Sequence, residues 1–396
     1  MKKIVIYSFL ILTILACSEK KGIINAYKIL HVGVDKSEVN MEYMQHASKL
    51  VDSVYYIPLE TTSECLIAEI TKLIFTDNFI YVWDYKVNKL YQFDVTGKFI
   101  RQIGQIGQGP DEYVRINSFD VNKKNGNISI RCEMKQSVLE YDYTGKLVQV
   151  KKIGMVANNF IYYKDNYLFY CSTFPNRDIF NKTFPEQYRL VNALDGKIYE
   201  QYLKWTYNDY LSTSIFASNE REGLYQFNEN IMLVENATNT VYKIEHDTIL
   251  PIYAVDFGEY NIPFDMFSPQ ASKAKLDELA NVGTKVCRLT KFCETNDLIY
   301  IQYIAHHYKL FGFSIFLKKT EEMINMGPLW FNDMDNIAMP LIATVHDDLL
   351  IGYFYAFNFY KMVKYSNIEV SKHLVELGKT GNNDDNPIIC VVKMKK

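Results

Sequence analysis

The sequence predicts an all-β fold: a six-bladed β-propeller of four-stranded antiparallel blades, with two short helical insertions. Two observations favour it. Aromatic residues make up 15% of the 396 residues, led by 31 Tyr and 24 Phe, and aromatic side chains suit a pleated, half-buried surface. A unit of polar turns and alternating apolar strands also recurs about every 50 residues, a spacing in the range of propeller blades.

Residues 1–16 have the pattern of an export signal. Lys2 and Lys3 precede an apolar run over 4–15 that is too short to span a bilayer. The small Ala16 directly before Cys17 resembles the end of a bacterial lipoprotein signal. The resemblance implies cleavage before Cys17 and acylation of that residue, which would anchor the protein in the cell envelope, in our expectation at the outer membrane. An ordinary secretory signal with a chance cysteine is the alternative.

Residues 17–50 are predicted to form a polar tether with a short strand over 26–32. Residues 51–396 are predicted to form the propeller, because short apolar alternations between turn residues begin there. The mature chain has no second apolar stretch long enough to cross a membrane. We therefore expect a globular body on a lipid anchor.

The clearest copies of the repeated unit occupy residues 77–104 and 126–154. Each contains two strands joined by a Thr-Gly-Lys turn, with Gly97 in the first copy and Gly145 in the second. Glycine tolerates the left-handed backbone that such turns require. Looser copies begin near residues 165, 228, 295 and 346. Since one four-stranded sheet cannot bury both of its faces, the six copies are expected to stack radially.

Two stretches break the strand pattern and are predicted to be surface helices. Residues 270–280 follow Pro269 and carry apolar side chains at helical spacing, and residues 367–377 have a similar pattern.

Several motifs occur in order along the first two copies. They are Ile57-Pro58-Leu59-Glu60-Thr61-Thr62, the turn Phe93-Asp94-x-x-Gly97-Lys98, and Gly107-x-Gly109-Pro110-x-Glu112-Tyr113. Together with the segment 386–389 they resemble the six-bladed β-propeller lipoproteins of Bacteroidetes, a family related to NHL-repeat propellers. The resemblance covers the chain from about residue 54 onward. It implies a monomer in which a strand near 54–59 completes the last blade, and it carries over no catalytic residue.

The charge and the cysteines exclude some classes of function. A net charge of -3 gives no case for nucleic-acid binding, which usually needs a basic face. The six cysteines besides Cys17 are widely and irregularly spaced, unlike a disulfide framework or a zinc site. We expect most of them to be buried as small apolar residues.

The glycine-rich segment 104–113 is the best local candidate for a site. Gly107 and Gly109 permit close backbone approach, but the segment opens no helix and lacks the Lys-Ser/Thr ending of a phosphate loop. We interpret this motif, which includes Pro110, as a connection between blades in which Glu112 and Tyr113 hold the next blade.

No metal or other cofactor is predicted. His306 and His307 are adjacent, so a strand would point them to opposite faces. The acidic stretches 333–336 and 384–386 lack the spacing of an EF-hand, and acidic turns in β proteins are usually solvated.

Aromatic residues in the connections between blades are the candidates for ligand binding: Trp205, Tyr207, Tyr210 and Trp330. They could stack on sugar rings, although packing between blades is the commoner role. The first hypothesis is a non-enzymatic protein that binds a glycan, a peptide or an envelope protein at the channel mouth. The alternative is a metal-dependent lyase or hydrolase, which a cluster of His and carboxylate side chains on the channel would support.

Overall fold

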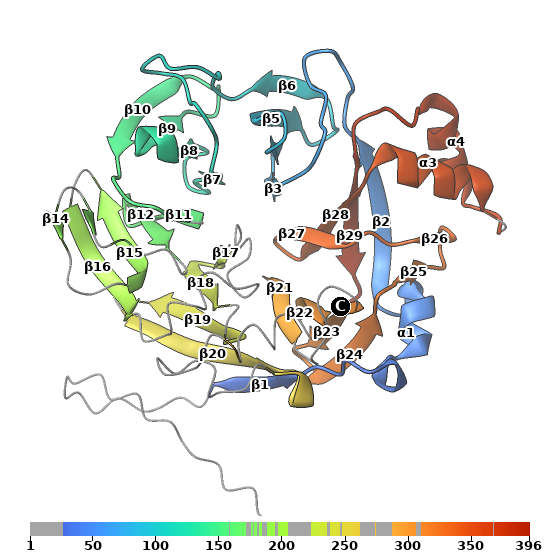
Figure 1. Cartoon of the computed structure of the whole chain (residues 1–396). Coiled ribbons are helices and arrows are strands. Elements are labelled where there is room, and N and C mark those ends of the chain that lie inside the picture. Colours follow the sequence, from blue (N-terminus) through green and yellow to red (C-terminus); the bar gives the residue numbers. More distant parts are fainter. Residues whose placement is uncertain are drawn as a thin grey trace, which may run out of the picture.

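The protein forms a ring of six blades, as predicted (Figure 1). In each blade, four antiparallel strands run outward from the channel to the perimeter. The computed structural model describes residues 27–157, 159–171, 176, 178–179, 182–183, 188–194, 197–204, 223–235, 238–245, 248–261, 274, 287–305, 310–366 and 368–396.

The first three blades follow one another in sequence. Blade 1 is β3 (Lys72–Phe75), β4 (Phe79–Asp84), β5 (Lys89–Asp94) and β6 (Phe99–Gln102); blade 2 is β7 (Ser118–Val121), β8 (Ile128–Cys132), β9 (Ser137–Tyr141) and β10 (Leu147–Lys152); blade 3 is β11 (Asn159–Tyr163), β12 (Asn166–Tyr170), β15 (Tyr188–Leu194) and β16 (Lys197–Lys204). A two-stranded ribbon of β13 (Asp178–Ile179) and β14 (Lys182–Thr183) interrupts blade 3.

The other three blades complete the ring, and the last one takes its outer strand from the N-terminal part of the chain. Blade 4 is β17 (Leu224–Phe227), β18 (Asn230–Glu235), β19 (Thr240–Glu245) and β20 (Thr248–Asp256); blade 5 is β21 (Cys287–Glu294), β22 (Leu298–Ala305), β23 (Leu310–Leu317) and β24 (Glu322–Gly327); blade 6 is β27 (Ile342–His346), β28 (Leu349–Phe354), β29 (Ile388–Met394) and β2 (Val51–Pro58). A ribbon of β25 (Phe331–Asn332) and β26 (Ile337–Ala338) precedes blade 6.

The ring is closed by pairing between β2 and β29. These strands are antiparallel, with Val54 opposite Val392 and Ile57 opposite Ile389, so a strand near 54–59 completes the last blade. The buried Asn386 fixes the same junction: its Nδ2 donates to Glu60 O (2.7 Å), its Oδ1 accepts from Ile67 N (2.8 Å), and its backbone N–H donates to Thr61 Oγ1 (2.8 Å).

Part of the predicted tether packs on the propeller. The strand expected over 26–32 is β1 (Lys28–His31), which runs parallel to β20 at the edge of blade 4. The chain then crosses the rim of blade 5, where Asn40 N donates to Asn325 O (2.8 Å), and forms the short helix α1 (Met41–Gln45). The N-terminal segment thus runs along blades 4 and 5 before it enters blade 6.

Two helices lie between β28 and β29. They are α3 (Ala356–Tyr365) and α4 (Lys372–Thr380), and their buried Phe359 and Leu374 join the core beside blade 6. The helix predicted over 367–377 corresponds to α4. The sequence did not predict α3, because its Phe, Tyr and Val side chains are typical of strands. The helix predicted over 270–280 lies outside the described residues, apart from Ala274.

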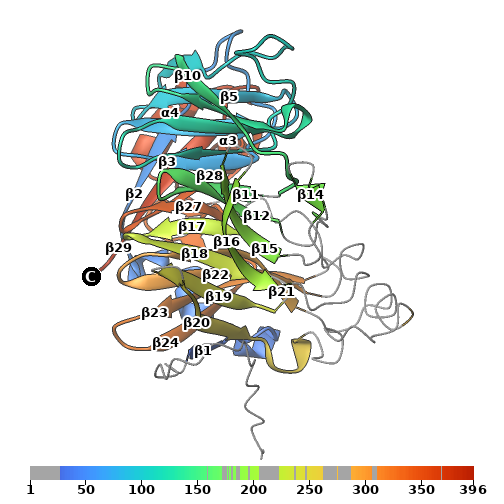
Figure 2. The ribbon, with the colours of Figure 1, turned by 90° about the vertical axis from the view of Figure 1, so that its left-hand side faces the viewer.

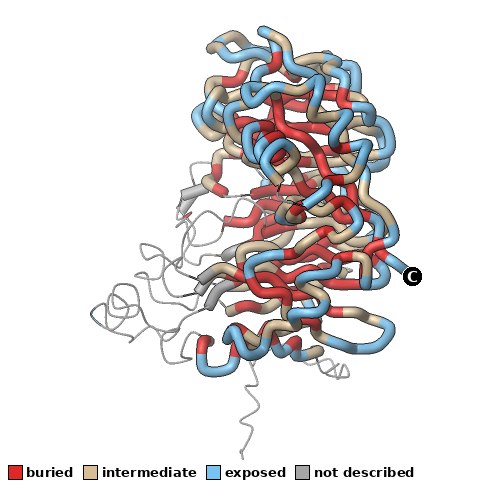
Figure 3. Tube along the Cα trace, turned by 90° about the vertical axis from the view of Figure 1, so that its right-hand side faces the viewer, coloured by how far each residue is buried: buried red, intermediate tan, exposed pale blue. Residues whose placement is uncertain are grey.

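The hydrophobic core lies between neighbouring blades. Between blades 1 and 2, for example, Tyr81 and Trp83 pack with Phe119 and Ile130. Figure 2 shows the ring edge-on, and in Figure 3 the buried strand segments run through it between exposed turns. Within the described part of the chain, no helix has the length and apolar character that a membrane span requires.

Candidate functional site

Two cavities occupy the central channel of the ring. One cavity, of about 860 Å³, opens at the face that carries the turns between β3 and β4 and between β7 and β8. The other, of about 800 Å³, opens at the opposite face. Both volumes lie within the usual range for small-molecule sites. The two cavities meet at mid-channel, because five residues line both of them: Lys72, Leu73, Lys291, Phe292 and Ala343.

Lys72 enters the channel from β3, the inner strand of blade 1. Its Nζ donates a hydrogen bond to Phe119 O in blade 2 (2.7 Å) and lies 5.3 Å from the centre of the Phe119 ring. Burial lowers the pKa of Lys72, and the negative charge of Asp120 partly opposes this shift. The side chain therefore links blades 1 and 2 inside the ring.

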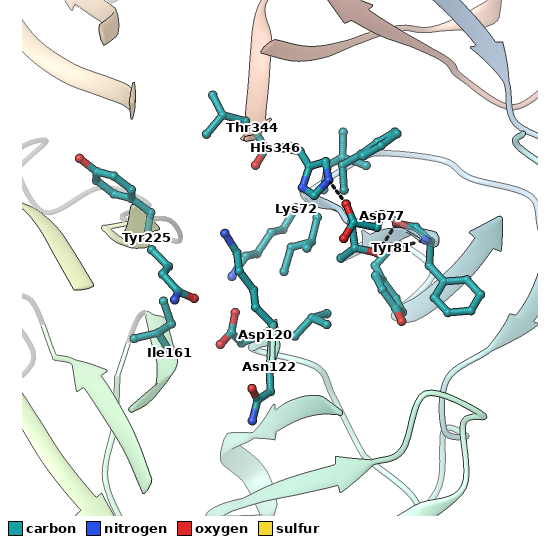
Figure 4. Close-up of a pocket in the computed structure, with 18 of the residues that line it drawn as sticks. Lys72, Asp77, Tyr81, Asp120, Asn122, Ile161, Tyr225, Thr344 and His346 are labelled. Carbon is teal, nitrogen blue, oxygen red and sulfur yellow. Dashed lines mark hydrogen bonds and ion pairs between the residues drawn. The ribbon is translucent and has the colours of Figure 1, made fainter. Parts of the chain in front are cut away.

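Asp120 projects from β7 into the same space (Figure 4). Its carboxylate accepts a hydrogen bond from Tyr162 N in blade 3 (2.9 Å). Burial raises the pKa of Asp120, and Lys72 is the largest opposing influence. Lys72 and Asp120 together connect the inner strands of the first three blades.

Lys291 reaches the channel from β21 in blade 5, which blade 6 separates from blade 1. The pairing of β21 with β22 shifts between Leu289 and Lys291, so Thr290 is an extra residue in the strand. Such a bulge re-aims the side chains on either side of it: here Leu289 is buried in the core and Lys291 lines the channel. Burial lowers the pKa of Lys291, and the nearby positive charge of Lys72 lowers it further.

Asp77, His346 and Asp347 gather at the mouth of the larger cavity. His346 Nε2 lies 2.9 Å from Asp77 Oδ1 and 4.0 Å from Asp347 Oδ2, and its ring packs against Phe75. The ligand atoms of the three residues lie within 4.8 Å of one another, and one imidazole and two carboxylates could hold a divalent cation. Both aspartates are largely exposed, with 83% and 81% of their side chains accessible.

Sequence reasoning missed both of these groups. Asp77 and His346 lie in blades 1 and 6, and Lys72 and Lys291 in blades 1 and 5, so only ring closure brings them together. The bulge at Thr290, which turns Lys291 inward, left no recognisable signal in the sequence.

Comparison with known proteins gives the family. A family described as a domain of unknown function (DUF4934) matches residues 33–393. The chain belongs to this family. A search among proteins of curated function found no match.

Two solved structures share the fold. A "putative exported protein" from Bacteroides fragilis has a TM-score of 0.71 and 19% identity, over 93% of this chain and 100% of that one. A member of the DUF4221 family from Bacteroides vulgatus has a TM-score of 0.51 and 9% identity, over 88% of this chain and 98% of that one. At these identities the likeness shows the fold alone.

In this DUF4934 protein the glycine-rich motif lies between β6 and β7. Glu112 Oε2 accepts from Gly109 N (2.8 Å), and a Cβ at Gly107 would collide with the same carboxylate. Tyr113 is fully buried between blades 1 and 2. Lys135 Nζ donates to Glu112 O (2.5 Å) and also to Gly109 O, next to Pro110. The motif is thus occupied by contacts within the protein.

Gly97 and Gly145 occupy equivalent turns in blades 1 and 2. Their φ angles are +90° and +81°, in the region that favours glycine. Each turn packs on the outer strand of the preceding blade: Gly97 faces Pro58 of β2, and Gly145 faces Arg101 of β6.

The structure places the other candidates as follows. Trp330 is only 2% exposed, and its ring packs on Phe313 in the core between blades 5 and 6, away from both cavities. Trp205, Tyr207, Tyr210, His306 and His307 lie outside the described residues.

The acidic stretches make structural contacts. Asp333 accepts from Ser48 N (2.8 Å), and Asp335 accepts from the hydroxyl of Tyr56 (2.9 Å), so both hold the N-terminal segment. Asp385 accepts from Asn382 N (2.7 Å) within its own turn. Among the described residues the free cysteines are all buried: Cys65, Cys132, Cys171, Cys293 and Cys390.

Proposed function

We propose that this protein is a non-enzymatic binding protein of the cell envelope whose ligand occupies the central channel. The observation that carries the proposal is the pair of cavities, about 860 and 800 Å³, that share their lining at mid-channel. A concave site of this size is the usual form of a small-molecule site, and here apolar and aromatic side chains stand among many polar and charged ones.

The lining supports a glycan or a short peptide as ligand. Phe75, Tyr225 and Phe292 offer aromatic surface, and Gln226 and Thr344 offer neutral hydrogen-bonding groups in the same cavity. Aromatic faces pack on sugar rings or apolar side chains, while amides and hydroxyls pair with hydroxyl or peptide groups. An envelope protein that inserts a loop into the channel fits the same lining.

The proposal includes a lipid anchor at Cys17, and this anchor is tested separately from ligand binding. The sequence Ile14-Leu15-Ala16-Cys17 supports it. The description of the structurally similar Bacteroides fragilis protein as exported supports export of this chain. We also propose that the protein lies at the outer membrane. A relation to NHL-repeat propellers is proposed as well, and the Gly97 and Gly145 turns support that relation.

The anchor is tested by Cys17→Ser. This variant is expected to abolish incorporation of an alkyne-labelled fatty acid and to release the protein from the membrane fraction. Labelling that persists in this variant would contradict the anchor.

Channel occupancy is tested by filling the channel. Thr344→Trp and Gln226→Trp each add an indole to the cavity wall, from blades 6 and 4 respectively. Val148→Trp adds the same group at an exposed position on the outer strand β10. The purified full-length proteins are compared on glycan and peptide arrays, and native mass spectrometry detects any ligand that they retain.

We expect wild type and Val148→Trp to bind equally, and both channel variants to lose about tenfold or more in affinity. A melting curve confirms that each variant is folded. Binding that survives in both folded channel variants would place the site elsewhere, and a folded wild type with neither array binding nor retained ligand would also contradict the proposal.

A further inference from the structure

We propose that the channel ligand is an organic anion, best fitted by an acidic sugar, whose charged group binds between Lys72 and Lys291. This inference rests on the proposed channel-binding function and narrows its ligand class.

The first argument is position. Lys72 comes from blade 1 and Lys291 from blade 5, and both side chains line both cavities, so they face the part of the channel where the cavities meet. Neither position follows from the blade repeat, and Lys291 faces inward because of the bulge at Thr290. An anionic group at mid-channel would therefore meet ammonium groups from two sides of the ring.

The second argument is charge. On the six inner strands, the acidic and basic side chains that line the cavities are Lys72, Lys291, Asp120 and His346, within the described residues. His346 lies at the mouth beside Asp77, so two ammonium groups and one carboxylate remain deeper in the channel. Asp120 is already held by Tyr162 N. A bound anion would place a negative group beside both ammonium groups in a poorly hydrated space, where such an attraction is strong.

Burial supports the same conclusion. The pKa of each lysine is lowered chiefly by desolvation, and Lys72 lowers that of Lys291 further. A negative group between the two would favour both charged forms.

The rest of the lining favours a sugar acid over a simple ion. Asn122, Gln226 and Thr344 supply hydrogen-bonding groups around the lysines, and Phe292 and Tyr225 supply aromatic surface. A sugar acid has a carboxylate for the ammonium groups, hydroxyls for the amides, and an apolar ring face for the aromatics.

The test compares charged and neutral probes. Binding of galacturonate, galactose, glucose 6-phosphate and inorganic sulfate to the full-length protein is measured by calorimetry, for wild type and for Lys72→Met, Lys291→Met and Lys197→Met. The last variant removes the same charge from an exposed position on the outer strand β16. Glucose 6-phosphate and sulfate show whether a phosphate or a bare anion serves as well as a carboxylate.

We expect galacturonate to bind wild type and Lys197→Met with equal affinity, and galactose to bind at least about tenfold more weakly. Lys291→Met is expected to weaken galacturonate at least about tenfold and to leave galactose unchanged. Lys72→Met should act in the same direction, and Lys291→Met keeps the test valid if Lys72→Met fails to fold.

Two results would overturn the inference: none of the three anions binds wild type at millimolar concentration, or galacturonate binds Lys291→Met as tightly as wild type. A third result would contradict the anionic ligand and leave the proposed channel binding intact. In that result galactose or a glycan from the array binds as well as the anions, and Thr344→Trp abolishes this binding. If Thr344→Trp binds these ligands as tightly as wild type, the proposed binding in the channel is itself contradicted.

Discussion

The perimeter turns and the channel lining are built on opposite principles. In the turn of blade 1, Asp94 Oδ1 accepts from Thr96 N (2.9 Å) and Lys98 N (3.0 Å). In blade 2, Asp142 Oδ1 accepts from Thr144 N (2.9 Å) and Lys146 N (3.1 Å). The inner strands instead present unlike side chains to the channel: Lys72, Asp120, Ile161, Gln226, Lys291 and Thr344. Repetition builds the ring, and departures from it build the candidate site.

This comparison separates two kinds of variant. Changes at the perimeter and at the ring closure should cost stability and leave the channel chemistry intact in the molecules that fold. Changes in the channel should alter binding and have small or even favourable effects on stability.

The largest effect is expected at Gly97. A Cβ there would collide with the backbone oxygen of Pro58, and the φ of +90° is unfavourable for alanine. Gly97→Ala should therefore lower the free energy of unfolding by about 3 kcal/mol or more. Gly145→Ala is the matched control: its Cβ would meet the flexible Arg101 side chain at 3.0 Å and the Ile103 side chain at an ordinary contact distance of 3.5 Å, so we expect a loss of about 1 kcal/mol. Equal losses in urea unfolding would show that packing on the preceding blade is irrelevant.

The next largest effect is expected at the ring closure. Asn386→Ala removes the acceptor of Ile67 N and the donor to Glu60 O, and leaves both backbone groups without this partner in a buried junction. We expect a loss of about 2–3 kcal/mol in the free energy of unfolding. The exposed neighbour Asn382→Ala should change it by less than about 0.5 kcal/mol. An unaltered unfolding curve for Asn386→Ala would mean that this clamp does not stabilise the closed ring.

A gain in stability is expected in the channel. Lys291→Met replaces a desolvated ammonium group with an apolar side chain of similar length, so the ligand-free protein should become about 1 kcal/mol more stable at pH 7. Lys197→Met, at the perimeter, should be neutral in the same thermal melts. A clear loss of stability in Lys291→Met would indicate that the lysine has a structural role.

The pH dependence has a definite sign. The folded-state pKa of Lys291 lies below that of the unfolded chain, so between these values the unfolded chain binds more protons and the folded state gains stability as the pH rises. The stability of wild type should therefore approach that of Lys291→Met as the pH rises toward about 10. Burial is the largest cause of the lowered pKa; Cys293 on the same strand opposes it, and Lys72 from blade 1 adds to it. Asp120 and Tyr225 line the same cavity. A gap between the two proteins that stays constant with pH would refute this account.

The smallest effect is expected at the mouth. Because Asp77 and Asp347 are largely exposed, His346→Ala should lower the free energy of unfolding by less than about 1 kcal/mol. Chelator should leave the melting temperature of the purified protein unchanged. A stoichiometric metal whose removal lowers it would favour the metal-dependent enzyme and direct mutagenesis to His346.

The same contrast explains what the sequence could predict. The Asp-x-Thr-Gly-Lys turns and the strand alternation are local, so the blades and their order could be predicted from neighbouring residues. The strand that closes the ring followed from a family resemblance. The channel site could not be predicted, because Lys72 and Lys291 meet only across the ring and the bulge at Thr290 decides where Lys291 points. The helix α3 escaped prediction because packing against blade 6 overrode its strand-like composition.

The most direct test of the account is a titration of the channel lysines. Lysines of the full-length protein are dimethylated with ¹³C, which preserves their charge, and the signals of Lys72 and Lys291 are assigned by their absence in the Met variants. The account predicts that these two titrate at lower pH than the surface lysines, and that galacturonate raises both pKa values. Titration of Lys72 and Lys291 together with the surface lysines, unaffected by galacturonate, would contradict it.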